Sequence, residues 1–401
     1  MAVATGEGAL AGIRVLDLGI IVQGPQAAQL LRDLGADVIK IELPGIGDQA
    51  RWIPLSLEDR RSAYFVGCNR GKRGMTLDLR TQAGRDVMLH LVEEADVVVS
   101  NFVPGTLEAW GLGYEVLAAR NPRLVLGCGS TFGPAGPDAS RKGADLAGQA
   151  AGGLIRSMGS ASDQPTPVGV TIADHIGSQN LANGVLAALV ARQRTGRGQK
   201  VEVSLLGGQI YAQASEITAV ALTGRPNSPE PGGHPLISMF YGVVPTSDGQ
   251  IALVGILPDE RPAFFAAIGR PELAEDPRFA EGWFPPGVRG ELFEALAEAF
   301  RKRSTAEWVE VLAAGNYRYA VVHDQQQVLE DEGALANGYL QRVDHPEWGE
   351  LTMVGSPIRM SDTPARPGRF APELGQHTEE ILLEHGYDWE AIAHLREQGA
   401  I

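Results

Sequence analysis

Residues 167–206 have the sequence PVGVTIADHIGSQNLANGVLAALVARQRTGRGQKVEVSLL. Within residues 181–190, leucine, valine and alanine side chains recur every four positions, which predicts an amphipathic helix. Gly196 follows two arginines and is expected to end that helix. Apolar and polar residues then alternate over residues 200–205, which predicts a half-buried strand. The stretch therefore predicts a helix that leads directly into a strand, as in layered α/β folds.

One carboxylate in this stretch, Asp174, falls at the start of the predicted helix. Aspartate is a favoured N-cap residue and contributes about 1 kcal/mol in that role, so one interpretation of Asp174 is purely structural. The other interpretation is a nucleophile, kept ionised by the positive end of the helix dipole. The residues of this stretch alone favour the cap, and the rest of the chain decides between the two.

The N-terminal part of the chain alternates short apolar strands with helices. This alternation predicts a parallel, doubly wound α/β sheet of the Rossmann-like kind, which the helix and strand of residues 167–206 continue. The expected strands are residues 13–19, 37–42, 75–79, 96–99 and 124–127, with helices at 24–35 and 81–94.

A second, smaller α+β domain is expected at residues 223–331. It opens with a Pro- and Gly-rich linker at 223–235. Its expected elements are strands within 240–255, turning at Ser247-Asp248-Gly249, and helices near 261–268 and within 293–312. Short helices near 378–384 and 389–397 close the chain. Residues 1–222, completed by about 332–401, are expected to form the large domain.

Composition excludes several classes of protein. The chain has 401 residues and a formal net charge of -15, which disfavours nucleic acid and anionic membranes as partners. Two distant cysteines, Cys68 and Cys128, fit neither a disulfide scaffold nor a metal site and are typical of a reducing compartment. The first residues lack a signal-peptide pattern, and no apolar run reaches the roughly 18 residues of a membrane span. We expect a cytoplasmic protein.

Common catalytic motifs are missing. The sequence has no phosphate-binding GxxxxGK[ST] loop, no GxGxxG after a strand and no GxSxG elbow. The eight histidines lack metal-ligand spacing, so no metal is expected. Basic residues do cluster within 69–74 and at Arg141-Lys142. Each cluster alone is typical of a solvated surface, but at the strand ends of a parallel sheet such clusters can bind phosphates.

The order of several segments resembles one family. These segments include LAGIRVLDLG (10–19), GADVIKIE (35–42), CNRGKRGMTLDL (68–79), ADVVVSNFVPGTLEAWGLGYE (95–115), the Asp174 helix with TGRGQKVEVSLL (195–206), GRPELAEDPRF (269–279) and LGQHTEEIL (374–382). Together they resemble the class III coenzyme A transferases, the formyl-CoA transferase or CaiB/BaiF type. The resemblance extends over nearly the whole chain.

The resemblance implies a mechanism and partners. An aspartate matching Asp174 attacks an acyl-CoA thioester and forms a mixed anhydride. The released thiolate then forms an aspartyl-CoA thioester, from which a free carboxylic acid finally receives the CoA. This is covalent catalysis in a site that excludes water. The family resemblance also implies an interlocked homodimer, with acyl-CoA as a substrate and no permanently bound cofactor.

The resemblance also implies further site residues. Those expected at bound CoA are Val22, Lys72, Arg73, Asn101, Phe102, Thr106 and Lys142. Those expected in the substrate pocket are Gln23, Tyr64, Asp145, Gly232 and Gly233. The chain departs from the formyl-CoA branch in several places: Val22, followed by Gln23, replaces an active-site glutamine, Leu43 and Ala109 replace CoA-binding arginines, and the glycine-rich lid at Gly232 and Gly233 is shorter. These departures suggest an acceptor acid other than oxalate or formate.

Two alternatives remain at this point. The related 2-methylacyl-CoA racemases use a His–Asp pair as two bases, and their histidine would fall at Ala144, beside Asp145. Its absence favours transfer. A non-catalytic CoA-binding protein with the same fold is the second alternative, and in that case Asp174 would only cap its helix.

Overall fold

The computed structural model describes residues 8–158, 164–227, 233–237, 240–279, 284, 287–368 and 370–401. The chain divides into two compact units. Unit 1 holds the residues up to Gly152 together with Val168–Ala212 and Asp331–Ile401, and unit 2 holds Gly153–Pro167 and Gln213–Glu330. The predicted boundary at residue 222 differs from this division, because Gly153–Pro167 and helix α9 (Ala214–Thr223) belong to unit 2.

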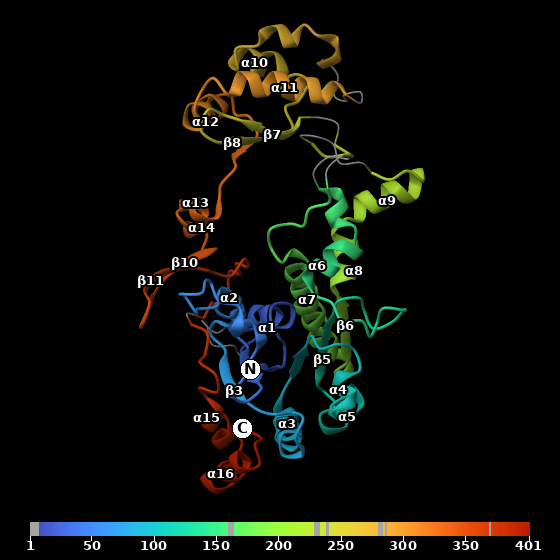
Figure 1. Ribbon diagram of the computed structural model, residues 1–401, viewed down its shortest axis with the longest axis vertical. Helices are drawn as coiled ribbons and strands as arrows, with labels where there is room; N and C mark the ends of the chain where they lie inside the picture. The colour runs from blue at the N-terminus through green and yellow to red at the C-terminus, as the bar shows by residue number, and fades with distance from the viewer. Residues whose placement is uncertain are drawn as a thin grey trace. The chain divides into compact units, whose positions relative to one another are not determined.

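Unit 1 is built on a six-stranded parallel sheet with the strand order β3-β2-β1-β4-β5-β6 (Figure 1). Its strands are β1 (Arg14–Asp17), β2 (Asp37–Glu42), β3 (Arg73–Thr76), β4 (Val97–Ser100), β5 (Val125–Ser130) and β6 (Lys200–Ser204). The register places Leu16 beside Ile39 on one side and beside Val98 on the other. The predicted parallel α/β sheet is confirmed.

Alternating side chains give this sheet two apolar faces. Val15 packs with α1 (Gln23–Asp33) and α7 (Ile172–Thr195) on one face. Leu16 points the opposite way and packs with α3 (Gln82–Glu94) on the other. Because both faces are covered, the central strands are apolar at nearly every position.

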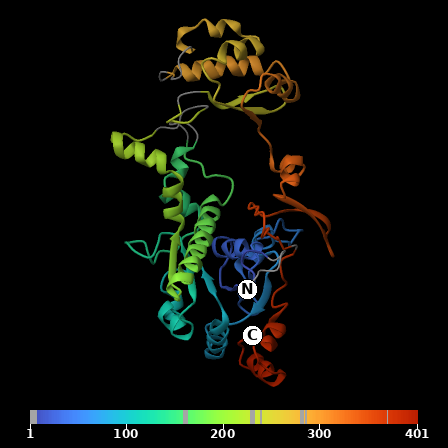
Figure 2. The ribbon, with the colours of Figure 1, turned by 180° about the vertical axis from the view of Figure 1, so that it is seen from behind.

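The remaining elements of unit 1 complete these layers. They are η1 (Gln49–Trp52), α2 (Ala63–Asn69), α4 (Thr106–Ala109), α5 (Tyr114–Arg120), α6 (Asp145–Ala151), α8 (Leu205–Ala212), α14 (Glu332–Ala336), β10 (Leu340–His345), β11 (Gly349–Val354), α15 (Thr378–Glu384) and α16 (Trp389–Glu397). Strands β10 and β11 form an antiparallel hairpin. Helix α15 contacts β3, so the end of the chain returns to the edge of the sheet (red in Figures 1 and 2).

The strand order fixes where a ligand is expected. Strands β1 and β4 are neighbours, although β2 and β3 separate them along the chain. The connections after β1 and β4 therefore leave the sheet in opposite directions. In open α/β sheets this reversal opens a crevice at the carboxyl ends of the two strands, where ligands bind.

Unit 2 is a small α+β body. It contains η2 (Leu154–Ser157), α9, β7 (Tyr241–Pro245), β8 (Gln250–Val254), α10 (Arg261–Ala267), η3 (Pro271–Ala274), η4 (Pro277–Phe279), α11 (Val288–Phe300), α12 (Thr305–Ala314), β9 (Tyr319–Val321) and α13 (Gln325–Leu329). The three strands form an antiparallel sheet. Its core is rich in aromatic rings, with Phe300 and Trp308 stacked 4.4 Å apart. A capping box between Ser304 and Glu307 starts α12.

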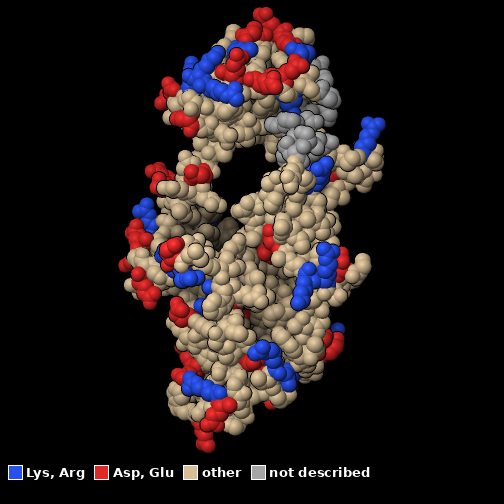
Figure 3. Space-filling view, in the orientation of Figure 1, with Lys and Arg blue, Asp and Glu red and all other residues tan. Residues whose placement is uncertain are grey.

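Acidic and basic side chains are interspersed over the face drawn in Figure 3. Among the described residues, no helix has the length and apolar character needed to cross a bilayer.

Candidate active site

The start of α7 places Asp174 at the carboxyl edge of the sheet. Helix α7 connects β5 to β6, and a helix joining parallel strands runs antiparallel to them. Thr171 precedes the helix, and its side chain makes no capping hydrogen bond. Asp174 is the third helical residue. The interpretation of Asp174 as the N-cap was therefore wrong.

Asp145, from the start of α6, performs the capping. Its Oδ1 accepts hydrogen bonds from the backbone N–H groups of Ala173 at 2.8 Å and Asp174 at 3.2 Å. Its Oδ2 accepts from Gln149 Nε2 at 2.6 Å. Gln149 Oε1 in turn accepts from the Val168 N–H at 3.1 Å. Asp145 is thus held rigidly against the first turn of α7.

The Asp174 carboxylate is half-buried and has no hydrogen-bond partner among the residues that the structure describes. Burial, reinforced by the negative charge of Asp145, raises the pKa of Asp174 to about 7. The sequence argument expected the helix dipole to keep this group charged, but the loss of hydration dominates. A substantial fraction of Asp174 is protonated at neutral pH.

Gln23 fills a gap beside this site. It is buried at the start of α1, between Gly129 of β5 and Gly177 of α7. A Cβ atom on Gly129 would lie 2.4 Å from Gln23 Oε1, and one on Gly177 would lie 2.8 Å from Nε2. The two glycines therefore make room for the side chain. Within the described residues, Gln23 Nε2 has no hydrogen-bond partner.

The loop between β1 and α1 is held from two sides. Asn101, after β4, accepts a hydrogen bond from the Ile20 N–H at 2.7 Å and donates one to the Ile20 carbonyl at 2.9 Å. Asp48 accepts from the N–H of Ile21, whose φ of 63° is left-handed. Such backbone is costly for a β-branched residue and persists where its surroundings fix it. Val22 follows as the buried residue preceding α1.

Lys72 lies beneath this loop and is fully buried. Its ammonium group donates to Asp17 Oδ2, to the Pro25 carbonyl and to Asn69 Oδ1, each at 2.7 Å. These bonds use all three ammonium hydrogens. The geometry therefore gives Lys72 a supporting role under α1 and leaves no donor for a CoA phosphate.

The other residues expected to contact CoA differ in whether their side chains are already engaged in contacts within the protein. Arg73 pairs with Asp37 and Glu384, each at 2.7 Å. Phe102 packs edge-to-face on Trp110, with ring centroids 5.3 Å apart. Thr106 is the first residue of α4. Lys142 is exposed in the loop before α6, and no hydrogen bond or ion pair involves its side chain within the described part of the chain.

The remaining predicted pocket residues are divided between the units. Tyr64 is half-buried on α2 of unit 1. Gly233 belongs to unit 2, where a Cβ atom would lie 2.7 Å from Arg289 Cζ. Gly232 lies outside the described residues.

Sequence reasoning did not assign roles to several residues of the site. His175, next to Asp174 in the sequence, is held by two contacts: its Nδ1 lies 2.5 Å from Gln26 Oε1, and its Nε2 lies 3.3 Å from Thr171 Oγ1. Burial lowers the pKa of His175, so the ring is neutral near pH 7. Asp48 lies six residues after the GADVIKIE segment (35–42) that carries part of the family resemblance, whereas no local pattern marks Gln26 or Gln149.

Metal chemistry has no candidate ligands here, since the described ranges contain no cluster of His, Cys, Asp and Glu that could hold an ion. The arrangement instead offers an unpaired carboxylate, rigidly presented at the crevice of the sheet. Such a group can act as a nucleophile toward an activated acyl group.

Comparisons with known proteins agree with the resemblance in the sequence. The model of CoA-transferase family III matches residues 10–378. Succinyl-CoA--D-citramalate CoA-transferase of Chloroflexus aurantiacus is 36% identical over 378 residues, 93% of this chain and 92% of the relative. Succinyl-CoA:glutarate CoA-transferase of Homo sapiens is 31% identical, over 98% of this chain and 90% of the relative.

A crystal structure of a CaiB/BaiF family protein from Brucella suis superposes with a TM-score of 0.85 and 32% identity. The match covers 94% of this chain and 100% of the Brucella suis chain. The chain belongs to CoA-transferase family III.

Proposed function

We propose that this CoA-transferase carries its reaction through a covalent intermediate on Asp174. The enzyme takes CoA from an acyl-CoA thioester and passes it to a free carboxylic acid. The observation that carries the proposal is the state of the Asp174 carboxylate, which is half-buried, held at the sheet crevice and bonded to no described side chain. Ionisable groups with perturbed pKa values in such positions are candidates for catalysis.

The first half-reaction loads CoA onto the enzyme. The ionised Asp174 oxygen attacks the thioester carbonyl, the C–S bond breaks, and a mixed anhydride and CoA thiolate result. The thiolate then attacks the Asp174 carbonyl carbon. The donor acid leaves as its carboxylate, and an aspartyl-CoA thioester remains.

The second half-reaction reverses these steps with a different acid. The acceptor carboxylate attacks the aspartyl thioester and displaces the thiolate, which gives a new anhydride. The thiolate attacks the acceptor's acyl carbon, which releases the product acyl-CoA and the free Asp174 carboxylate. No proton, oxidant or reductant is consumed, so the chemistry requires only positioning and the exclusion of water.

Hydrogen bonds around Asp174 hold its carboxylate in position for nucleophilic attack. Asp145 takes the N–H groups of Ala173 and Asp174, and the N–H of Ile172 donates to the Val170 carbonyl at 2.8 Å. The first amides of α7 therefore have no free N–H group to stabilise a tetrahedral oxyanion. Their bonds to Asp145 fix the carboxylate's position, and its raised pKa makes the ionised form a stronger nucleophile.

CoA is proposed to lie along the carboxyl ends of β1 and β4. Asn101 and Phe102 follow β4 at this crevice, and Lys142 precedes α6, which carries Asp145. Lys142 is the residue of the predicted CoA set whose charge is free to meet a phosphate. CoA acts here as a substrate.

Succinyl-CoA is the donor that we propose, with a dicarboxylic acid as the acceptor. The support is the names of the C. aurantiacus and human relatives, which both specify succinyl-CoA and a dicarboxylate. A panel of acyl-CoA thioesters against aliphatic, branched and aromatic acids, read by mass spectrometry, tests this choice. Faster transfer from another donor would contradict it.

We also propose that the enzyme works as a homodimer. In support, helix α9 exposes three large apolar side chains, Ile217, Val220 and Leu222, the last of which is 82% exposed. Exposed apolar patches of this kind mark interfaces. Light scattering after size exclusion should give twice the chain mass, and a monomer at working concentrations would contradict the proposal.

Substitution of Asp174 separates catalysis from a structural role. Asp174→Ala should reduce CoA transfer by roughly 10³-fold or more, while CoA still binds with nearly unchanged affinity. Asp86→Ala, at an exposed position on α3, is the matched control and should leave both quantities unchanged. Full activity of Asp174→Ala would reduce Asp174 to a structural residue.

The racemase alternative has its own test. Ala144 precedes α6 and offers no base beside Asp145. Incubation with a chiral 2-methylacyl-CoA in deuterated water should therefore give no deuterium at the α-carbon. Incorporation of deuterium without CoA transfer would replace the proposed function with racemisation.

A further inference from the structure

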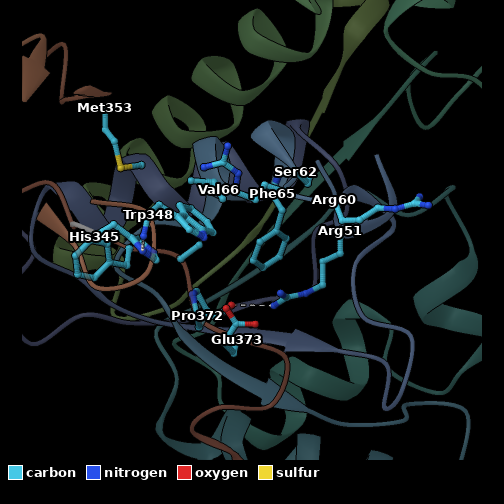
Figure 4. A pocket seen from close by; sticks show the side chains of 13 residues that line it. Arg51, Arg60, Ser62, Phe65, Val66, His345, Trp348, Met353, Pro372 and Glu373 are labelled. Atoms are coloured by element: carbon cyan, nitrogen blue, oxygen red, sulfur yellow. Dashed lines mark hydrogen bonds between the residues drawn. The ribbon is translucent and has the colours of Figure 1, made fainter. Parts of the chain in front are cut away.

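A pocket of about 320 Å³ lies in unit 1 between η1, α2 and the hairpin β10–β11 (Figure 4). This volume is within the range of small-molecule sites. None of its lining residues belongs to the Asp174 site described above. The residues that line it are Arg51, Arg60, Arg61, Ser62, Phe65, Val66, His345, Trp348, Met353, Phe370, Ala371, Pro372 and Glu373.

The walls of this pocket are aromatic. At the hairpin turn, the rings of His345 and Trp348 stack in parallel, 3.9 Å apart. Phe370 packs its ring edge-to-face on His345. Phe65 of α2 lies across the pocket from the His345–Trp348 pair (Figure 4). Guanidinium groups already lie over two of these rings, with Arg51 Cζ 3.5 Å from the Phe65 centroid and Arg61 Cζ 5.3 Å from the Trp348 ring. A planar ligand would stack on the ring faces that remain.

Guanidinium groups line the same pocket, and two of them have N–H groups without a hydrogen-bond partner among the described residues. Arg51 is bound to Glu42 by Nε and Nη2, both at 2.8 Å, and donates to the Pro372 carbonyl at 3.0 Å. Its Nη1 has no partner among the described residues. Arg60 likewise has no bonded partner there. Arg61, in contrast, pairs with Asp59 at 2.5 Å.

We propose that this pocket is a second ligand site, which takes a small aromatic anion of the nucleoside monophosphate class. A purine ring fits the aromatic walls, because base–aromatic stacking needs only a flat face. A phosphate inside the pocket can meet the Arg51 guanidinium, and Arg60 contributes positive charge at the edge of the pocket, where its side chain extends away from the His345–Trp348 pair (Figure 4). Glu373 lines the pocket with a carboxylate that can accept a hydrogen bond from an exocyclic amine.

Arg51 is unsuited to testing this proposal, because it also supports the candidate active site. Glu42 Oε1 accepts hydrogen bonds from both Arg51 Nε and the Asp48 N–H. Asp48 in turn holds Ile21, just before Gln23. Arg60 and Trp348 have no such connection and can be replaced without disturbing that loop.

Calorimetric titration with adenosine monophosphate, in the absence and presence of saturating CoA, tests the proposal. We expect one site per chain, with the same affinity under both conditions. Arg60→Gln and Trp348→Ala should each weaken binding by about tenfold, whereas Trp348→Phe keeps most of the affinity. Arg194→Gln, at an exposed position in the last turn of α7, is the control and should bind like the wild type.

Adenosine contains only the stacking ring and inorganic phosphate only the anionic group. Each should therefore bind far more weakly than the nucleotide. Binding of benzoate in preference to adenosine monophosphate would overturn the nucleotide class. Absence of nucleotide binding, displacement of the nucleotide by CoA, or unchanged binding by both Arg60→Gln and Trp348→Ala would overturn the site.

Discussion

Two groups of carboxylates in unit 1 have opposite surroundings. Beneath the β1–α1 loop, Asp17 is paired with Lys72 at 2.7 Å and Asp48 with Lys40 at 2.9 Å, and all four side chains are 0% exposed. At the start of α7, Asp174 has a carboxylate neighbour, Asp145, and no cation beside it among the residues that the structure describes. The paired carboxylates use their charge to hold backbone in place. The carboxylate without a cation remains available to a substrate, and its ionisation in the folded protein costs stability.

The largest expected effect is the loss of stability when a paired carboxylate loses its cation. Lys72→Met leaves Asp17 buried without its cation, which should lower the free energy of unfolding by about 3–5 kcal/mol. Urea unfolding at pH 7.5 measures this change. Combining Lys72→Met with Asp17→Leu should recover much of the loss, because the stranded charge is then removed. If the single variant were as stable as the wild type, the pair would not support the loop as described.

Asp174→Asn should have the opposite effect on stability, and the effect should depend on pH. Burial and Asp145 raise the folded-state pKa of Asp174 to about 7, well above the unfolded value of about 3.9. Ionisation in the folded state therefore costs stability as the pH rises from about 4 to about 7. Thermal unfolding should show Asp174→Asn gaining more stability over the wild type at pH 8 than at pH 4. An equal difference at both pH values would contradict the assigned pKa.

A smaller effect is expected when the neighbouring charge is removed. Asp145→Asn keeps an oxygen for the amides of α7 but removes the second cause of the raised pKa of Asp174. The acid limb of the pH profile of kcat/KM is expected near pH 7 in the wild type, from the pKa of Asp174, and should move to lower pH in the variant. Burial remains the larger cause, so the limb should stay above about pH 4. A limb that does not move would mean that another group controls the profile.

The smallest effect concerns an exposed cation. Lys142 is exposed and forms no ion pair within the described part of the chain, so Lys142→Gln should change the free energy of unfolding by less than about 0.5 kcal/mol. The KM for acyl-CoA should rise about three- to tenfold through loss of one phosphate contact, with kcat nearly unchanged. Steady-state kinetics separates these parameters. An unchanged KM would remove Lys142 from the CoA site.

Local patterns predicted much of the fold. The bounds expected for β2, α15 and α16 match the structure, and Gly196 ends α7 with a φ of 71°. These elements depend on apolar periodicity and on residues at their own ends. The boundary of unit 2 was less predictable, because Gly153–Pro167 joins it across a long sequence separation.

The site was predictable in composition and less so in geometry. The family resemblance identified Asp174 and Asp145 as site residues. It did not predict that Asp145, rather than Asp174, caps α7. That exchange depends on contacts between α6 and α7, which no local pattern encodes. Likewise, Lys72 in a basic segment resembles a phosphate ligand until its burial against Asp17 is seen.

Trapping of the covalent intermediate tests the central claim most directly. Hydroxylamine added during turnover with succinyl-CoA should convert an activated Asp174 to its hydroxamate, found by mass spectrometry on the peptide that carries Asp174. Asp145, which keeps its carboxylate throughout, and the two cysteines, whose pKa values burial raises to about 11 for Cys68 and about 12 for Cys128, should remain unmodified. Continued turnover with no mark on Asp174, or with the mark on another residue, would contradict the account.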